Sequence, residues 1–168
     1  NWKTESFKKW WLEKLGFRRS TFTNKAMNAG THFEHKILAT IPGVRMDHQI
    51  LIPELRLRVN LDGDKDGTIY EVKTHREDVN FKVSKQYWRQ AQIEMFAHKT
   101  DKLYIVSYPL REREYKNYFA EIDEARILFT NVNYDGRFIC GEYMPRLRYL
   151  KKCLEEGVMP SEIDYAKR

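Results

Sequence analysis

The sequence predicts a mixed α/β protein, an α+β arrangement in which helices flank a central mixed sheet. Two strand-like segments follow one another near the middle of the chain, at 55–62 and 67–74, with an acidic turn between them. Segments with helical periodicity lie on either side of this pair, at 4–15, 24–41 and 84–98. Helices and strands in this order are typical of a mixed sheet covered by helices.

Length and composition indicate one folded domain. The chain has 168 residues, of which 42% are hydrophobic, enough to bury a core. No apolar run has the length of a membrane span. The net charge of +6 suits a polyanionic partner, although moderately basic proteins are common. Two cysteines, Cys140 and Cys153, lack metal-ligand spacing, and we expect both to be buried free thiols.

The first helix is expected at 4–15, with Thr4 as N-cap and Gly16 as the stop. Its apolar face consists of Phe7, Trp11 and Leu15. Lysines cover the other faces, and Arg18 and Arg19 follow. Basic residues between aromatic ones could track a phosphate backbone, and an ordinary solvated face over core tryptophans explains them equally well.

A second helix is predicted at 24–41, where a Pro-Gly turn ends it. Glu34 lies on its apolar stripe, and a lone buried carboxylate is costly there. A salt bridge with a nearby Lys or Arg is the ordinary explanation, and a functional site is the other. Gly30 in mid-helix is unfavourable unless another element approaches closely.

The central strands bring charged residues together. A strand at 46–52 leads into 55–62, which alternates apolar and polar residues and ends at Asp62. In the strand 67–74, Glu71 and Lys73 share one face, and the turn returns Asp62 towards them. Two carboxylates and an ammonium at one sheet edge can hold a divalent cation and polarise a water beside it.

Two other interpretations compete for these residues. Asp62, Asp64, Asp66 and Gly67 match the start of an EF-hand calcium loop. The twelfth loop position is Lys73 instead of the required Glu, however, and the flanks are strands instead of helices. The other alternative is a hairpin with a solvated acidic turn, since Asp-Gly marks hairpins in any case.

The segment 84–98 predicts a helix that presents two stripes. Its core face consists of Trp88, Ala91 and Met95. The neighbouring stripe consists of Tyr87, Gln90 and Glu94.

The last third of the chain is expected to complete the sheet and to end in a helix. A buried strand is predicted at 102–108 and an edge strand at 117–122, whereas 125–136 fits no element clearly. The final helix has Pro145 in its first turn and ends at Gly157.

Several motifs resemble a known family. LDGDKDGTIYEVK resembles the D-x(n)-(D/E)-x-K signature of the PD-(D/E)xK nuclease superfamily. NAGTHFEH resembles the helix that precedes the core strands in exonucleases of the phage lambda type, and YWRQAQIEMFA resembles their Y-x-x-Q-x-Q-x-x-M helix. KLYIVSY falls where those enzymes have the next strand. The chain therefore resembles the lambda-exonuclease and YqaJ-like phage recombination nucleases.

This resemblance implies a restriction-endonuclease-like core, a central mixed sheet flanked by helices, in a single nuclease domain at 1–168. Within it, an N-terminal helix and basic segment would occupy 1–22, and the catalytic core 24–108. A C-terminal strand and helix would occupy 109–168.

The resemblance also implies roles for the central residues. Asp62 and Glu71 would ligate the catalytic metal, one or two Mg²⁺ or Mn²⁺ ions, with the backbone carbonyl of Val72 as a further ligand. Lys73 would orient the attacking water and stabilise charge on the phosphate. Glu34 would face the metal site, through water or directly at a second ion.

Residues beside the metal site would contact DNA or the reacting groups. Gln90 would help to position Lys73 or the nucleophile, and Tyr87 would contact DNA. The region before Gly30 is much shorter than in the lambda enzyme, and the Gly-Ser motif of YqaJ-like proteins is absent. Since that region binds the 5′ end in those enzymes, we expect a replacement phosphate pocket made of Arg18, Arg19, Ser20 and Thr21.

The expected function is a metal-dependent DNA nuclease, more narrowly a 5′→3′ double-strand exonuclease of phage-type recombination. It would act on linear duplex with a 5′ phosphate, beside a single-strand annealing protein, as a ring-like trimer in the cytoplasm of a bacterial or phage-infected cell. A targeting segment before Asn1 would place it in an organelle instead. The alternatives are an endonuclease of restriction or resolvase type, and a non-catalytic nucleic-acid binding module. Intact Asp62, Glu71 and Lys73 argue against the binding module.

Overall fold

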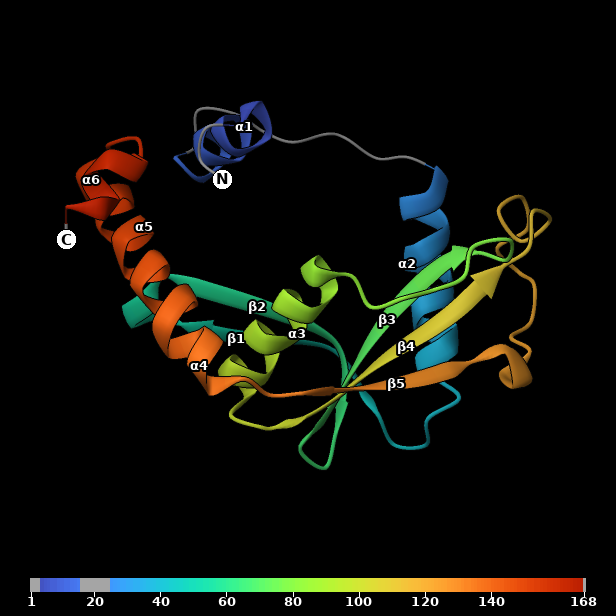
Figure 1. Cartoon of the computed structure of the whole chain (residues 1–168). Helices are drawn as coiled ribbons and strands as arrows, with labels where there is room; N and C mark the ends of the chain where they lie inside the picture. The colour runs from blue at the N-terminus through green and yellow to red at the C-terminus, as the bar shows by residue number, and fades with distance from the viewer. Residues whose placement is uncertain (1–3, 16–24, 168) are drawn as a thin grey trace. The chain divides into compact units, whose positions relative to one another are not determined.

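A computed structural model describes residues 4–15 and 25–167, in which five strands form one mixed sheet (Figure 1). The strands are β1 (Arg45–Ile52), β2 (Leu57–Lys65), β3 (Thr68–Arg76), β4 (Lys102–Leu110) and β5 (Leu128–Asn133). The helices are α1 (Glu5–Lys14), α2 (Lys25–Leu38), α3 (Lys85–His98), α4 (Gly136–Phe138), α5 (Met144–Glu156) and α6 (Glu162–Ala166). The predicted fold class is thereby confirmed. No helix in the described part of the chain is both long enough and apolar enough to span a membrane.

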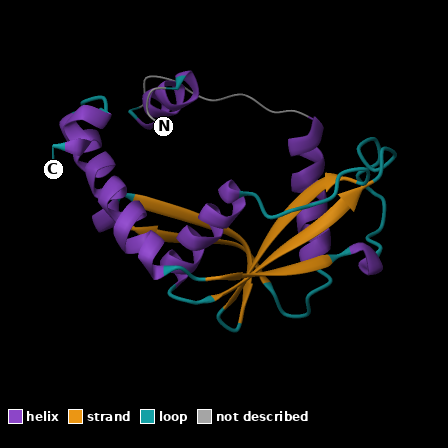
Figure 2. Ribbon diagram, viewed as in Figure 1, coloured by secondary structure: helices purple, strands orange, loops and turns teal. Residues whose placement is uncertain are grey.

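The strands lie in the order β1-β2-β3-β4-β5, and every neighbouring pair is antiparallel except β3 and β4 (Figure 2). A parallel pair needs a crossover connection, and α3 provides it. The turn between β2 and β3 consists of Asp66 and Gly67, whose φ angles are 49° and 76°. Two such residues suit a tight two-residue hairpin turn, so the predicted Asp-Gly hairpin is confirmed.

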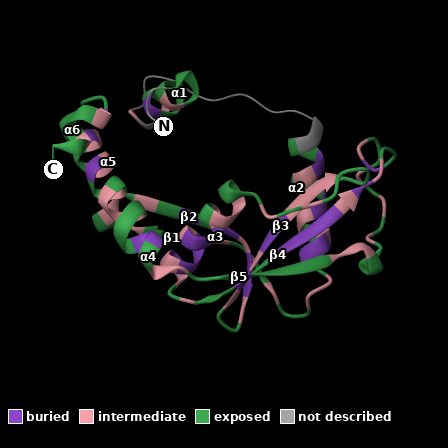
Figure 3. Ribbon diagram, viewed as in Figure 1, coloured by how far each residue is buried: buried purple, intermediate pink, exposed green. Residues whose placement is uncertain are grey.

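Helices cover the two faces of the sheet, and β3 and β4 are largely buried between them (Figure 3). On one face, buried side chains of α2 pack against those of β3 and β4. We call this group the α2-side cluster: Ala29, Phe33, Ile37, Leu38, Val72, Val106, Tyr108 and Leu110. On the other face, buried side chains of α3 pack against those of β2 to β5. We call this group the α3-side cluster: Val59, Leu61, Ile69, Ala91, Met95, Ala97, Leu103, Ile105 and Val132. Because Ile69 and Val72 lie in different clusters, the two faces predicted for β3 are confirmed.

The β1–β2 hairpin exchanges faces part of the way along. In β1, Met46 packs against the α2-side cluster, whereas Ile50 packs against the α3-side cluster. Asp47 lies between them with a φ of 55°, a left-handed conformation that Asp tolerates better than most residues. In β2 the exchange falls between Leu61, in the α3-side cluster, and Gly63, which faces α2. Asp62 therefore lies at the point of reversal.

Contacts along the chain form two compact units, each with its own core. The sheet unit spans 23–53 and 57–135 and contains all five strands, α2 and α3. The terminal unit combines residues up to 22 with 54–56 and 136–168. Its described core is Trp11, Tyr149 and Cys153.

Two expectations from the sequence are wrong. Residues 117–122 form no strand, and the edge strand is β5 instead. Three residues of that segment, Tyr118, Ala120 and Ile122, pack against the α2-side cluster, whereas Phe119 is exposed. The ammonium of Lys36 on α2 donates to the carbonyls of Tyr118 and Ala120, at 2.6 and 3.0 Å, so a side chain takes the place of a strand neighbour. Cys140 is exposed, and only Cys153 is buried.

Candidate active site

Asp62 is held against the backbone of β3. The ladder between β2 and β3 runs only from Lys65–Thr68 to Gly63–Tyr70, and beyond it the strands separate. Asp62 is the first residue past this point, and its Oδ2 accepts a hydrogen bond of 2.8 Å from the N–H of Val72. The carboxylate of Asp62 thus accepts the hydrogen bond that a backbone carbonyl of β2 would otherwise accept. It lies beside Val72, the residue between Glu71 and Lys73. A role for the Val72 carbonyl stays a prediction.

Glu71, Lys73 and Gln90 form one hydrogen-bonded group on the α3 side of the sheet. Both the ammonium of Lys73 and the amide nitrogen of Gln90 donate to Oε1 of Glu71, the latter at 2.5 Å. The ammonium of Lys73 also lies 5.2 Å from the ring centroid of Tyr87, so the ring and the carboxylate limit where it can move. The structure therefore brings together three predicted catalytic residues and Tyr87.

Glu94 belongs to the same group, although its place in the sequence predicts no role for it. It lies one turn after Gln90 on α3, its side chain is buried, and its Oε1 accepts a hydrogen bond of 2.8 Å from Gln90. The signal in the sequence was an acid at the i+4 position from Gln90, between core residues Ala91 and Met95. No motif singles out that position, so only the fold identified it.

Glu34 reaches the site from the opposite helix. Gly30, one turn earlier on α2, faces β3, and a Cβ there would lie 3.4 Å from Oγ1 of Thr74, an ordinary van der Waals distance. Among the described residues no salt bridge with Lys or Arg holds Glu34, and the ordinary explanation for its position is not observed. Ligand atoms of Glu34, His35 and Asp47 all lie within 4.8 Å of one another, close enough to share a metal ion.

The electrostatics of the site are those of an excess of carboxylates. Burial, with the charge of Asp62 second, raises the pKa of Glu34 to about 7. Burial raises the pKa of Asp62 to about 7, with the charge of Glu71 second. Burial raises the pKa of Glu71 to about 7, and the charge of Glu94 is the second cause. Burial likewise raises the pKa of Glu94 to about 7. Burial alone would lower the pKa of Lys73, but Glu71 outweighs it and the pKa is raised.

These residues fit a divalent cation. One oxygen of Glu71 and one of Glu94, in each case Oε2, are buried without a hydrogen-bond partner among the described residues. Hard oxygen donors are the ligands that Mg²⁺ and Mn²⁺ take. One ammonium, that of Lys73, faces four carboxylates, so the site has negative charge to spare for one or two ions.

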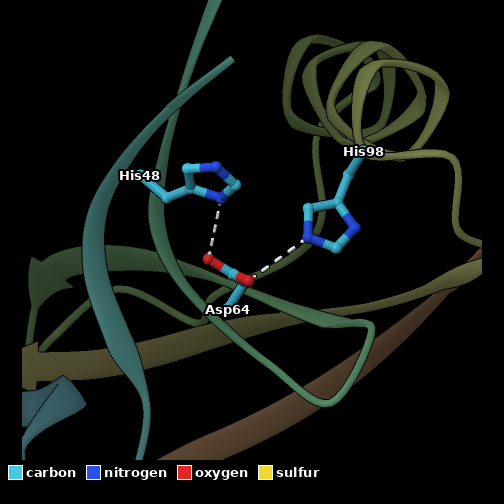
Figure 4. A group of neighbouring side chains, drawn as sticks. All are labelled: His48, Asp64 and His98. Carbon is cyan, nitrogen blue, oxygen red and sulfur yellow. Dashed lines mark hydrogen bonds and ion pairs between the residues drawn. The ribbon is translucent and has the colours of Figure 1, made fainter.

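A second polar cluster lies further along the hairpin. Figure 4 shows His48 of β1 and His98 of α3 directed at the carboxylate of Asp64 on β2, at 3.0 and 3.2 Å. Arg45 also donates to both oxygens of Asp64, at 3.1 and 2.8 Å. Burial alone would raise the pKa of Asp64, but the hydrogen bonds from Arg45 and His98 outweigh it and hold the pKa below its usual value.

The geometry of the second cluster, with ligand atoms within 4.8 Å of one another, would admit a metal ion. The guanidinium of Arg45 already neutralises Asp64, however, and the cluster serves to tie β1, β2 and the end of α3 together. Asp64 in a strand and paired with Arg45 is no ligand of a calcium loop. The EF-hand interpretation is therefore wrong.

The predicted phosphate pocket cannot be placed. Arg18, Arg19, Ser20 and Thr21 lie outside the described residues. Their assignment stays a prediction.

Two solved structures are similar to this chain. An alkaline exonuclease from Laribacter hongkongensis, LHK-Exo, aligns with a TM-score of 0.68 and 23% identity over 99% of this chain and 86% of that chain. A phage-related exonuclease from Haemophilus somnus 129PT aligns with a TM-score of 0.66 and 14% identity over 91% of this chain and 82% of that chain. No protein-family model and no curated protein matches the sequence. The chain therefore has the fold of these two exonucleases.

Proposed function

We propose that the protein is a Mg²⁺- or Mn²⁺-dependent deoxyribonuclease, more narrowly a 5′→3′ exonuclease of linear double-stranded DNA. The observation that carries the proposal is the convergence of Asp62, Glu71 and Lys73 where β2 leaves β3, with Gln90 bonded to the same carboxylate. The two structures of similar fold, both described as exonucleases, support the same class of reaction.

Asp62 and Glu71 would hold the ion, with Glu34 and the carbonyl of Val72 completing its surroundings. An ion bound there would polarise the phosphodiester and make a nearby water a better nucleophile. The raised pKa values of these acids support the assignment, because a cation lowers the cost of keeping buried carboxylates ionised.

The other side chains would prepare the site for the phosphate. Lys73 stays protonated, because Glu71 holds its pKa above the usual value, and its charge would stabilise negative charge that builds up on the phosphate oxygens. Gln90 fixes the side of Glu71 that Lys73 also contacts. Tyr87, beside Lys73, has the apolar surface to contact a nucleotide.

The finer parts of the proposal concern the substrate end and the partners. A linear duplex with a 5′ phosphate would be seated by the basic segment that contains Arg18 and Arg19. A single-strand annealing protein and a ring-like trimer are the proposed partner and assembly, in the cytoplasm of a bacterial or phage-infected cell.

One assay tests the activity and its dependence on ends. Linear and covalently closed circular forms of one plasmid are incubated with the protein in Mg²⁺, in Ca²⁺ and in excess chelator. Asp62→Asn serves as the control for a contaminating nuclease. We expect loss of the linear form in Mg²⁺ alone, an intact circle, and no reaction with Asp62→Asn, because Ca²⁺ binds carboxylates at longer distances and misplaces water and phosphate.

The outcomes separate the parts of the proposal. Cutting of the closed circle at a comparable rate would replace the exonuclease with an endonuclease. Cleavage in excess chelator that is lost in Asp62→Asn would remove the metal dependence, and a wild type no more active in Mg²⁺ than Asp62→Asn would remove the nuclease altogether.

A further inference from the structure

Glu94 is a buried carboxylate beside the candidate active site, and its side chain is only 2% exposed. Its neighbours on the inner face of α3, Ala91 and Met95, belong to the α3-side cluster. An apolar residue at this position would extend the core. A carboxylate there is unfavourable for stability unless it has another use.

The amide of Gln90 lies between two carboxylates. Its nitrogen donates to Oε1 of Glu71 at 2.5 Å and to Oε1 of Glu94 at 2.8 Å. A primary amide has two N–H groups, so both are engaged and the amide oxygen is turned away from both acids. Gln90 cannot rotate its oxygen towards Glu71 without losing both hydrogen bonds.

The remaining contacts of these acids are unequal. Oε1 of Glu71 accepts from both Lys73 and Gln90, whereas its Oε2 has no hydrogen-bond partner within the described chain. Oε2 of Glu94 also lacks one there, and the ammonium of Lys73 is engaged by Glu71 instead. Two hydrogen bonds thus fix Oε1 of Glu71, whereas Oε2 is available to a ligand.

We propose that Glu94 is a positioning residue of the cation site: through Gln90 it fixes the carboxylate of Glu71 so that Oε2 of Glu71 binds the ion. Glu94 anchors one N–H of Gln90, which leaves the other N–H for Glu71. The inference rests on the proposed function, because it concerns the same site and assigns Glu94 no contact with the substrate.

The test measures Mn²⁺ binding to the full chain without DNA, by the loss of free-ion signal in electron paramagnetic resonance. Glu94→Met removes the acceptor and keeps the volume, whereas Glu94→Gln keeps an acceptor oxygen and removes the charge. We expect Glu94→Met to raise the Kd for Mn²⁺ about 10- to 100-fold, the usual effect of losing a group that orients a metal ligand. Glu94→Gln should bind Mn²⁺ almost as the wild type does.

Gln90 provides a second readout. If Glu94 acts through Gln90, then Gln90→Met should weaken Mn²⁺ binding to a similar extent, and Glu94→Met should add little to it in the double variant. The thermal midpoint in chelator should rise in both Glu94 variants, because a buried carboxylate has been removed. A purely structural role predicts a fall instead.

Gln92 is the matched control on the same helix. It is fully buried, and it bonds the carbonyl of Asn133 at 2.9 Å and the N–H of Asp135 at 2.6 Å, so it fastens the end of β5 to α3. Gln92→Met should lower the thermal midpoint and leave the Kd for Mn²⁺ unchanged.

Two results would overturn the inference. One is unaltered Mn²⁺ affinity in Glu94→Met, and the other is an equal loss in Glu94→Met and Glu94→Gln, since charge would then be responsible instead of the hydrogen bond. If the wild type cleaves DNA and the variants bind Mn²⁺ normally, only the role of Glu94 falls. If the wild type binds Mn²⁺ without cleaving DNA, the nuclease falls and the comparison of variants still decides the role of Glu94.

Discussion

At the scale of single residues, Lys73 is the cation that faces the carboxylates of the site. Lys73→Met should lower the rate of DNA cleavage by about 10²- to 10³-fold, the effect of removing one preorganised electrostatic group. DNA affinity should change far less, because backbone contacts elsewhere remain. Single-turnover cleavage and binding to the same duplex in Ca²⁺ measure the two quantities.

Lys65→Met is the control, since the ammonium of Lys65 donates to the carbonyl of Pro42 instead of a site residue. An unaltered rate in Lys73→Met would mean that the active site lies elsewhere.

The acids of the site predict how stability and metal binding depend on pH. Asp62 and Glu71 have pKa values raised to about 7, whereas in the unfolded chain such groups titrate near pH 4. Between these values the folded state holds protons that the unfolded state releases, so metal-free stability should fall as the pH rises from about 4.5 to 7. Mn²⁺ competes with those protons and should bind more tightly at pH 8 than at pH 6.

Thermal unfolding in chelator and in Mn²⁺, at both pH values, checks this. The upward shift of the midpoint by Mn²⁺ should be larger at pH 8, and Asp62→Asn should reduce it. An equal shift at the two pH values would show that protons and the ion do not share these carboxylates.

The sequence located the central acids because their spacing follows from strand geometry. Period-2 alternation places Glu71 and Lys73 on one face, and a tight turn returns Asp62 to them. Glu94 could not be located in the same way, because its proposed role depends on Gln90 turning both N–H groups to acids on different elements. That orientation is a property of the packed structure.

At the scale of elements, the close approach of α2 to β2 brings Glu34 towards Asp62. A Cβ on Gly63 would lie 2.8 Å from Cδ2 of Leu38 and 3.0 Å from Cγ2 of Val44. Gly63→Ala should therefore push α2 away, lower the free energy of unfolding by about 1–3 kcal/mol, and weaken Mn²⁺ binding. Gly141→Ala is the control, since a Cβ there meets nothing within 4 Å. Equal denaturant midpoints for the two variants would contradict a tight contact at Gly63.

The same scale explains the error over the edge strand. Residues 117–122 alternate as a strand does, since Tyr118, Ala120 and Ile122 are partly buried and Phe119 between them is exposed. The pattern records which side chains are covered and leaves open whether a sheet or a helix covers them. Lys36, more than eighty positions earlier, satisfies the backbone there, and no local signal announces such a partner.

At the scale of the whole molecule, the sheet unit contains every residue proposed for the cation site, from Glu34 to Glu94, whereas the basic segment proposed to seat the 5′ phosphate belongs to the terminal unit. A ligand stabilises the structure that it binds. Calorimetry in chelator should show two unfolding transitions, and Mn²⁺ should raise the midpoint temperature of only one of them. Tyr149→Ala, in the core of the terminal unit, should lower the midpoint temperature of the other transition, which Mn²⁺ does not shift. A single transition that moves as a whole would show that the units unfold together.

The core that joins Trp11 of α1 to Tyr149 and Cys153 of α5 also affects the order in which the two units fold during synthesis. The sheet unit ends at residue 135, so all of it is synthesised before α5 and α6. A nascent chain can therefore assemble the cation site before α1 packs against α5. Packing of α1 against α5 follows the synthesis of the sheet unit, and until then the aromatic face of α1 is surface that a chaperone can bind.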